Sequence, residues 1–367
     1  MHIAGKRLIL ALLSLLTLLA PALAAVQESQ PTTGDEQRSA SEQRQAPDSK
    51  PSFAVNVNLV NLFFTVKDRH GVPVRNLSRE DFEVYEDGKP QAIKYFQADA
   101  PQPLTLGLLV DTSGSTQRML PFIRRIGTQF FSEVLREKDL AFLMSFDVGV
   151  DLLHDLTGPS PDLLDAMLDT SANGGDSLIP DRQGFPDTRL GSRGTLLYDA
   201  IYLAATDELK HEVGRKTIVA ITDGMDQGSE TSIPATIEAA QKVDASVYVL
   251  IAADPDYGWR KEDIGRIAKE TGGSVIEVAQ KPGGLEKAIE LVSEELRSQY
   301  YIGYIPTLKP DGSFRKIRVQ VKRGDYHAQV RKGYYAPKQE ASSTTTTQKV
   351  ATAGPDVTPA GHGNSMR

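Results

Sequence analysis

From residue 104 to residue 296, short apolar runs alternate with segments in which apolar residues recur at helical spacing. The runs at 104–110 and 216–222 are mainly apolar, as expected of strands that are covered on both faces. We expect strands at 104–110, 140–146, 216–222, 246–251 and 274–278, and helices at 120–134, 195–209, 233–243, 264–270 and 285–296. This alternation predicts an α/β fold with a doubly wound, mostly parallel sheet.

Two regions outside this segment show the period of two that is typical of strands. Before it, the alternation changes phase at Val60, which predicts a β-bulge. Asp87 and Gly88 predict a tight hairpin turn that joins strands at 82–86 and 93–96. After it, the apolar residues Ile317, Val319 and Val321 alternate with polar residues and form another run of this kind, at 317–321.

Neither of these flanking regions is large enough to hold a stable core alone. We therefore expect both to pair into one small β-sandwich, which the α/β domain interrupts. The expected bounds are 53–100 and 299–337 for the two parts of the sandwich and 101–298 for the α/β domain. The alternative is two separate β-appendages.

The first 24 residues have the pattern of an export signal. Lys6 and Arg7 precede an apolar run at 8–20, and small residues at Ala22 and Ala24 form a cleavage pattern. An uncleaved anchor at 8–26 is the alternative. We expect a periplasmic or extracellular protein that has no stable membrane span after cleavage.

The segments 25–52 and 338–367 are polar and contain almost no large apolar residues. Such composition cannot bury enough surface to fold, so we expect a disordered linker and a disordered tail.

The chain has no cysteine. This excludes disulfides, a cysteine nucleophile, cysteine-ligated zinc and a lipid-modified cysteine, and it leaves oxygen or histidine ligands for any metal. The formal net charge is −7, and removal of the signal with its two basic residues would make it −9. An acidic balance disfavours nucleic acid as a partner.

Polar side chains follow two of the expected strands. Asp111, Ser113 and Ser115 come directly after the strand at 104–110, and Asp223 follows the strand at 216–222. Ligands of doubly wound sheets bind at the carboxyl ends of the strands, and oxygen ligands suit a hard cation such as Mg²⁺ or Mn²⁺. Two carboxylates would neutralise the ion and leave a position for an anionic group. The alternative is a turn that only caps the following helix.

These residues resemble the metal-ion-dependent adhesion site of the von Willebrand factor type A domain, over residues 103–296. The resemblance implies a metal site formed by Asp111, Ser113, Ser115, Thr195 and Asp223. It also implies that the hydroxyl groups contact the ion directly or nearly so, that the aspartates often act through water, and that an Asp or Glu of a partner completes the shell.

The flanking sequences at 84–91, 299–304 and 331–335 look like those of bacterial von Willebrand factor A-related proteins of the acidobacterial type. These are exported proteins whose molecular role is poorly defined. A long polar loop at 173–193 departs from the pattern.

The expected function is therefore that of an exported, non-enzymatic adhesion or protein-binding module. It would hold Mg²⁺, or Mn²⁺ or Ca²⁺, and bind a protein partner through an acidic group. One alternative is a metal-dependent hydrolase in which Asp226 acts as a base. Another is a structural envelope protein that a metal stabilises. A third, an esterase with Ser177 as nucleophile and Asp151 and His154 as partners, is disfavoured because the two sequence blocks come in reversed order.

Overall fold

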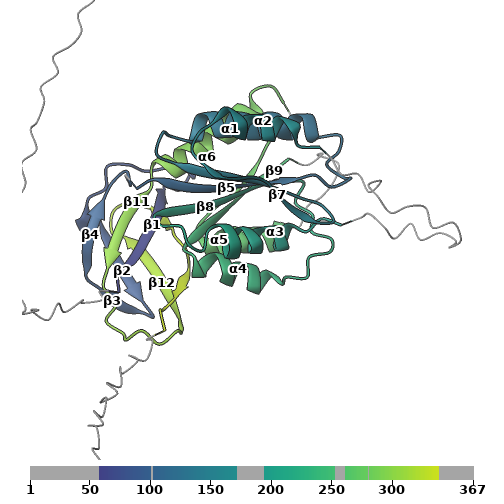
Figure 1. The fold of residues 1–367 in the computed structure, drawn as a ribbon. Coiled ribbons are helices and arrows are strands. Elements are labelled where there is room, and N and C mark those ends of the chain that lie inside the picture. Colours follow the sequence, from purple (N-terminus) through teal and green to yellow (C-terminus); the bar gives the residue numbers. More distant parts are fainter. Residues whose placement is uncertain (1–57, 101, 172–193, 253–260, 280, 339–367) are drawn as a thin grey trace, which may run out of the picture. The chain divides into compact units, whose positions relative to one another are not determined.

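A computed structural model describes residues 58–100, 102–171, 194–252, 261–279 and 281–338. They form one six-stranded sheet and two four-stranded sheets, with helices on the largest sheet (Figure 1). All of them belong to the second of two units, Val55–Arg367. The expected signal, the expected linker, the loop at 173–193 and residues 339–367 lie outside the described part of the chain.

The six-stranded sheet has the strand order β10-β9-β8-β5-β6-β7, with β5 near its centre. All neighbouring pairs are parallel except β6 and β7. Its strands are β5 (Leu104–Asp111), β6 (Leu140–Phe146), β7 (Val150–Thr157), β8 (Arg215–Thr222), β9 (Ala245–Ile251) and β10 (Val275–Glu277). The expected α/β fold with a mostly parallel sheet is confirmed.

Helices cover both faces of this sheet (Figure 1). One apolar core lies under α1 (Leu120–Val134), α2 (Pro161–Asp169) and α6 (Gly284–Arg297). The other lies under α3 (Leu197–Leu203), α4 (Ile233–Lys242) and α5 (Lys261–Thr271). Because the helices change face on either side of β5, the carboxyl end of β5 is the switch point at which such sheets bind ligands.

Three details of this domain differ from the sequence prediction. Strand β7 and helix α2 were not expected. β7 is an edge strand that exposes Leu152 and Leu153, so its sequence has no continuous apolar run of the kind that predicts a buried strand. The helix expected at 195–209 begins only at Leu197, and a π-helical segment, Ala204–Glu208, completes it.

The two smaller sheets have the strand orders β13-β1-β11-β4 and β14-β12-β2-β3. Their strands from before the α/β domain are β1 (Val60–Lys67), β2 (Phe82–Glu86), β3 (Lys89–Gln91) and β4 (Ile93–Gln97). Those from after it are β11 (Tyr300–Tyr304), β12 (Phe314–Val321), β13 (His327–Gln329) and β14 (Gly333–Tyr335), and a short 3₁₀ helix, Arg79–Asp81, precedes β2.

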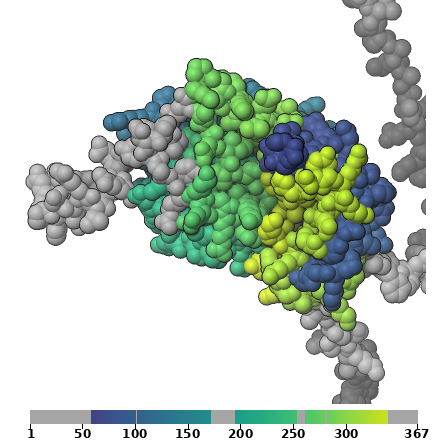
Figure 2. Space-filling model, turned by 180° about the vertical axis from the view of Figure 1, so that it is seen from behind, coloured from purple at the N-terminus to yellow at the C-terminus, as the bar shows by residue number. Residues whose placement is uncertain are grey.

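Each small sheet thus combines strands from both flanks, and one apolar core contains residues of both sheets. The space-filling view shows the surfaces of the two flanks in contact (Figure 2). The interrupted β-sandwich is confirmed as part of the fold, and the alternative of two separate appendages is wrong. The exact domain bounds stay predictions.

The hairpin at Asp87 and Gly88 is real, but its second strand was predicted wrongly. Both residues have positive φ, 47° and 79°, as a tight two-residue turn requires. The turn joins β2 to β3, whereas β4 pairs with β11 in the other sheet. The chain changes sheet after Gln91, and this change brings Ile93 into the sandwich core. The bulge predicted beside Val60 involves residues 55–57, which lie outside the described part.

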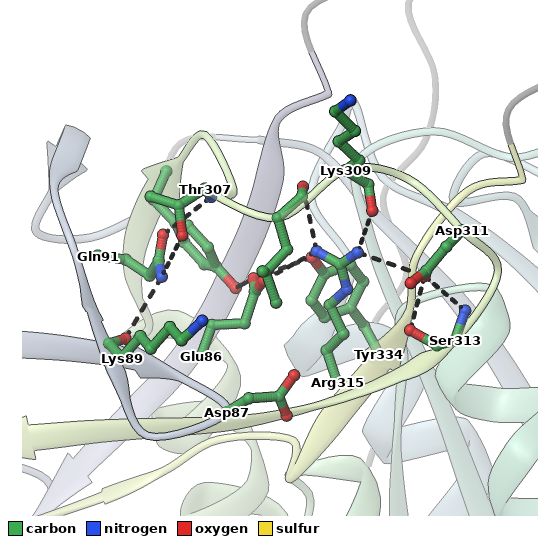
Figure 3. Close-up of polar contacts among 12 residues, drawn as sticks. Glu86, Asp87, Lys89, Gln91, Thr307, Lys309, Asp311, Ser313, Arg315 and Tyr334 are labelled. Atoms are coloured by element: carbon green, nitrogen blue, oxygen red, sulfur yellow. Dashed lines mark hydrogen bonds and ion pairs between the residues drawn. The ribbon is translucent and has the colours of Figure 1, made fainter.

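A buried ion pair lies inside the sandwich (Figure 3). Arg315 Nη1 lies 3.0 Å from Glu86 Oε1, and both side chains are almost completely buried. The hydroxyl groups of Tyr304 and Tyr334 donate to Glu86 Oε2 at 2.7 Å and 2.9 Å. The guanidinium of Arg315 also donates to the carbonyl oxygen of Lys309. The negative charge of Glu86 is therefore compensated within the chain.

None of the described helices is long and apolar enough to cross a membrane.

Candidate metal centre

Asp111 is the last residue of β5 and is fully buried. Its Oδ1 accepts a hydrogen bond from the backbone N–H of Ser113 at 3.0 Å, and its Oδ2 accepts one from the Thr222 hydroxyl at 2.5 Å. The Thr116 hydroxyl donates to the Asp111 carbonyl at 3.1 Å. These contacts fix the carboxyl group and close the turn that carries the next two predicted ligands.

Ser113 and Ser115 lie together on this turn. Their hydroxyl oxygens are 3.1 Å apart. Ser113 is buried, whereas Ser115 is exposed. The pair therefore connects the buried carboxyl group of Asp111 to the surface.

Asp223 follows β8, the neighbour of β5 in the sheet. It is partly exposed, and its Oδ1 accepts from the backbone N–H of Met225 at 3.0 Å. Burial, and then the charge of Asp223, raise the pKa of Asp111 to about 7, although hydrogen bonds from Ser113 and Thr222 act in the opposite direction. The structure thus brings the two predicted carboxylates into electrostatic contact.

No ion pair between described residues includes Asp111 or Asp223. Two close carboxylates without a cationic partner repel one another unless a cation or a proton compensates them.

Thr195 is buried and lies just before α3, outside the helix. Its N–H donates to the Gln227 carbonyl at 3.1 Å, and the Gln227 N–H donates back at 2.9 Å. Gln227 lies in the loop that begins with Asp223, so this pairing holds Thr195 at the same edge of the sheet as the other four residues.

The donor set fits a hard divalent cation. It consists of two carboxylates and three hydroxyl groups, which are the ligands that Mg²⁺ and Ca²⁺ prefer. Among the residues that the structure describes, no group of three or more His, Asp or Glu side chains could hold a metal ion. A metal at this edge would therefore depend on the hydroxyl groups as well. The assignment of Asp111, Ser113, Ser115, Thr195 and Asp223 as ligands stays a prediction.

Sequence reasoning missed two residues that organise this centre. Thr222, the residue before Asp223, binds Asp111 directly. Asp147 follows β6 and is almost fully buried. The signal for Asp147 was present, because β5, β6 and β8 all lead into an aspartate at their carboxyl ends.

Asp226, the base considered for a hydrolase, has a different role in the structure. Its Oδ1 accepts from the N–H of Tyr198 at 3.2 Å and from the hydroxyl of Ser229 at 2.6 Å. Tyr198 lies in the first turn of α3, and its N–H also donates to the Ser229 hydroxyl at 3.1 Å. Asp226 and Ser229 thus both accept from a backbone N–H at the start of this helix.

No family model matches the chain, and no curated protein matches it. Several solved structures resemble it. The conserved hypothetical protein BatB from Bacteroides thetaiotaomicron is 20% identical over 53% of this chain and 100% of its own, with a TM-score of 0.39. A von Willebrand factor type A protein from Catenulispora acidiphila is 10% identical over 78% of this chain and 76% of its own, with a TM-score of 0.42.

The pilus adhesin SpaC from Lactobacillus rhamnosus GG is 12% identical over 72% of this chain and 49% of its own, with a TM-score of 0.38. These three TM-scores are below 0.5, so the fold class follows from the strand order and the helix layers of this chain. Both are those of a doubly wound α/β domain, the fold class that the sequence predicts.

Proposed function

We propose that this chain is an exported protein-binding module whose α/β domain holds a divalent cation and, through it, an acidic group of a protein partner. The observation that supports this most is the pair of carboxylates at the ends of the neighbouring strands β5 and β8, Asp111 and Asp223. The charge of Asp223 acts on Asp111, and neither has a cationic partner among the described residues. A buried carboxylate is costly to keep charged unless a cation or hydrogen bonds compensate it.

In this proposal, Asp111 and Asp223 supply negative charge, and Ser113, Ser115 and Thr195 supply neutral oxygen donors. The bound ion, Mg²⁺ or else Mn²⁺ or Ca²⁺, would provide a positive charge that attracts a carboxylate of the partner. Thr222 and the N–H of Ser113 keep the Asp111 carboxyl group oriented for this role. The exposed position of Ser115 supports access from the surface.

Binding is favoured over hydrolysis by the contacts of Asp226. A general base must reach the proton that it removes, whereas Asp226 is engaged with α3 and Ser229. We therefore propose that the protein is not an enzyme.

The test is binding of a peptide library, or of proteins from a native envelope fraction, to the full chain with Mg²⁺ and with EDTA. We expect acidic peptides to bind with Mg²⁺ only, and the Asp111→Ala variant to lose this binding. Asp155→Ala is a matched control, because Asp155 is an exposed acid on β7 whose removal changes the net charge equally.

Binding that is indifferent to EDTA and to Asp111→Ala would contradict the proposal. Turnover of ester or phosphoester substrates that disappears in Asp223→Ala would favour the hydrolase. A large rise in melting temperature with Mg²⁺, without any preference for acidic peptides, would indicate a structural metal.

A further inference from the structure

A third aspartate lies at the same edge of the sheet as the predicted ligands. Asp147 follows β6, which neighbours β5, and it is 4% exposed. Its Oδ1 accepts from the N–H of Gly149 at 3.0 Å, and its own N–H donates to the Gly149 carbonyl at 2.9 Å. These two bonds fix a tight turn at 147–149.

The side chain of Asp147 also contacts the turn that carries the serines. Its Oδ2 accepts from the Thr112 hydroxyl at 3.3 Å. The Thr112 N–H donates to the Phe146 carbonyl at 3.0 Å. Thr112 lies between Asp111 and Ser113, so Asp147 helps to hold the segment that contains two predicted ligands.

The turn at 147–149 contacts the segment of Thr195 as well. The Asp147 carbonyl accepts from the N–H of Leu196 at 3.0 Å. A Cβ at Gly194 would lie 3.3 Å from the Cα of Val148 and 3.6 Å from the Gln227 carbonyl oxygen. The residues on both sides of Thr195 are therefore packed between this turn and the loop that begins with Asp223.

We propose that Asp147 is a positioning residue of the metal centre: it sets the relative placement of the Asp111–Ser115 turn and Thr195. This inference rests on the proposed function, because it concerns the geometry of the same site. Groups that hold metal ligands in place typically change metal affinity by about 10- to 100-fold when they are removed.

Asp139 offers a closely matched control. It is also 4% exposed, and it lies at the opposite end of the same two strands. Its Oδ1 accepts from the N–H of Leu104 at 2.8 Å, and its Oδ2 accepts from the N–H of Arg136 at 2.9 Å. Asp139→Ala thus removes an equally buried carboxylate and two hydrogen bonds, far along β5 from Asp111.

The experiment measures Mg²⁺ affinity by calorimetry, and amide hydrogen exchange without metal, for the full chain and its variants. We expect Asp147→Ala to weaken Mg²⁺ binding about 10- to 100-fold and to accelerate exchange at Leu196. Asp147→Asn should lose less affinity than the minimum of about 10-fold that is expected for Asp147→Ala, because an amide can still accept from Gly149 and donate to the Thr112 hydroxyl oxygen. Asp139→Ala should lower the melting temperature without changing Mg²⁺ affinity.

Equal losses of Mg²⁺ affinity in Asp147→Ala and Asp139→Ala would overturn the inference, and so would an unchanged affinity in Asp147→Ala. If the wild-type chain binds no Mg²⁺, the proposed function fails. The exchange measurement then still tests the positioning role, and unchanged exchange at Leu196 in Asp147→Ala would refute it.

Discussion

Glu86 and Asp111 are both fully buried carboxylates, but their surroundings differ. Glu86, in the sandwich, has the guanidinium of Arg315 at 3.0 Å and hydrogen bonds from two tyrosines. Asp111, in the α/β domain, has hydrogen bonds from Thr222 and Ser113 and a second carboxylate nearby. A cation of the chain pairs with the first charge, whereas no cation of a described residue pairs with the second.

The difference shows how burial of the same chemical group can serve stability or binding. A buried charge is tolerated when a paired cation and hydrogen bonds compensate it. At Glu86 the compensation is complete, and burial together with the nearby carboxylate raises the pKa of Tyr304 and of Tyr334, so that both hydroxyl groups remain protonated donors. At Asp111 no cation of a described residue pairs with the carboxylate, so a proton or a cation from solution is needed to compensate its charge. A cation in this role is what the proposed function requires.

The largest effect should come from breaking the compensated pair. Glu86→Ala leaves Arg315 buried without its carboxylate, and we expect a loss of about 3–5 kcal/mol in the free energy of unfolding. Urea denaturation measures this loss. Glu83→Ala, on the same strand but partly exposed, is the control and should cost less than about 1 kcal/mol. If Glu86→Ala and Glu83→Ala lower the free energy of unfolding equally, the buried pair of Glu86 and Arg315 contributes no more to stability than a partly exposed carboxylate does.

A smaller effect is expected when Mg²⁺ is added. At a concentration 100 times its Kd, Mg²⁺ should stabilise the wild-type chain by about 2.7 kcal/mol, whereas Asp111→Asn should show no such gain. Glu86→Ala should keep the gain, because Glu86 belongs to the other core. Thermal unfolding with and without EDTA distinguishes these outcomes, and a gain in Asp111→Asn equal to that of the wild type would exclude Asp111 as a ligand.

The two carboxylates should also differ in their response to pH. Burial and the nearby Asp223 raise the pKa of Asp111 to about 7 in the folded chain, above its ordinary value of 3.8. In the folded, metal-free chain, Asp111 therefore binds a proton below about pH 7. In the unfolded chain it binds this proton only below about pH 4. The stability of the metal-free chain should rise by about 2.6 kcal/mol as the pH falls from 8 to 5. Most of this gain is absent above pH 7, the folded pKa of Asp111.

Urea denaturation in EDTA at pH 8 and pH 5 tests this dependence, with Asp111→Asn as the control that lacks the titrating group. The difference between the two chains isolates Asp111 from all other acids. An identical pH response in both chains would show that Asp111 does not take up this proton.

The smallest effect should come from the tyrosines. Tyr334→Phe removes one hydrogen bond to the charged Glu86 and should cost about 1–2 kcal/mol. Tyr301→Phe removes a hydrogen bond to the neutral Asn61 side chain and should cost about 0.5–1 kcal/mol. Unfolding by urea gives both values, and a reversed order would show that the charge at Glu86 does not strengthen its hydrogen bonds.

Local sequence patterns were sufficient to predict most of the strands and helices of the α/β domain. The apolar strand runs and the helical spacing gave the order of the elements, and the polar residues after two strands gave Asp111 and Asp223. Asp147 was missed although Phe146 and Asp147 show the same strand-to-aspartate pattern as Thr222 and Asp223, because the resemblance assigns no ligand to the end of this strand. Thr195 was predicted only through the resemblance. Its backbone pairs with that of Gln227, which lies in a different loop, and no local sequence pattern indicates such a contact.

The sandwich shows what a local pattern cannot reveal. Arg315 stands in the inward-facing alternation of β12 with Ile317 and Val319, so its burial could have been expected. Its partner Glu86 is 229 positions away in the sequence, and no local feature identifies it. The pairing of β4 with β11 was missed for the same reason.

The position of the α/β domain between β4 and β11 has a consequence for the order of folding. β1 forms its sheet with β11, and residues paired across these strands are about 240 positions apart, as for Leu62 and Ile302. During synthesis, β1 cannot meet this neighbour until the chain has emerged as far as Tyr300. Strand contacts of such long range form slowly, so the α/β domain can complete its own sheet while the sandwich still awaits its last strands. Until then the apolar face of β1 is a surface that can aggregate.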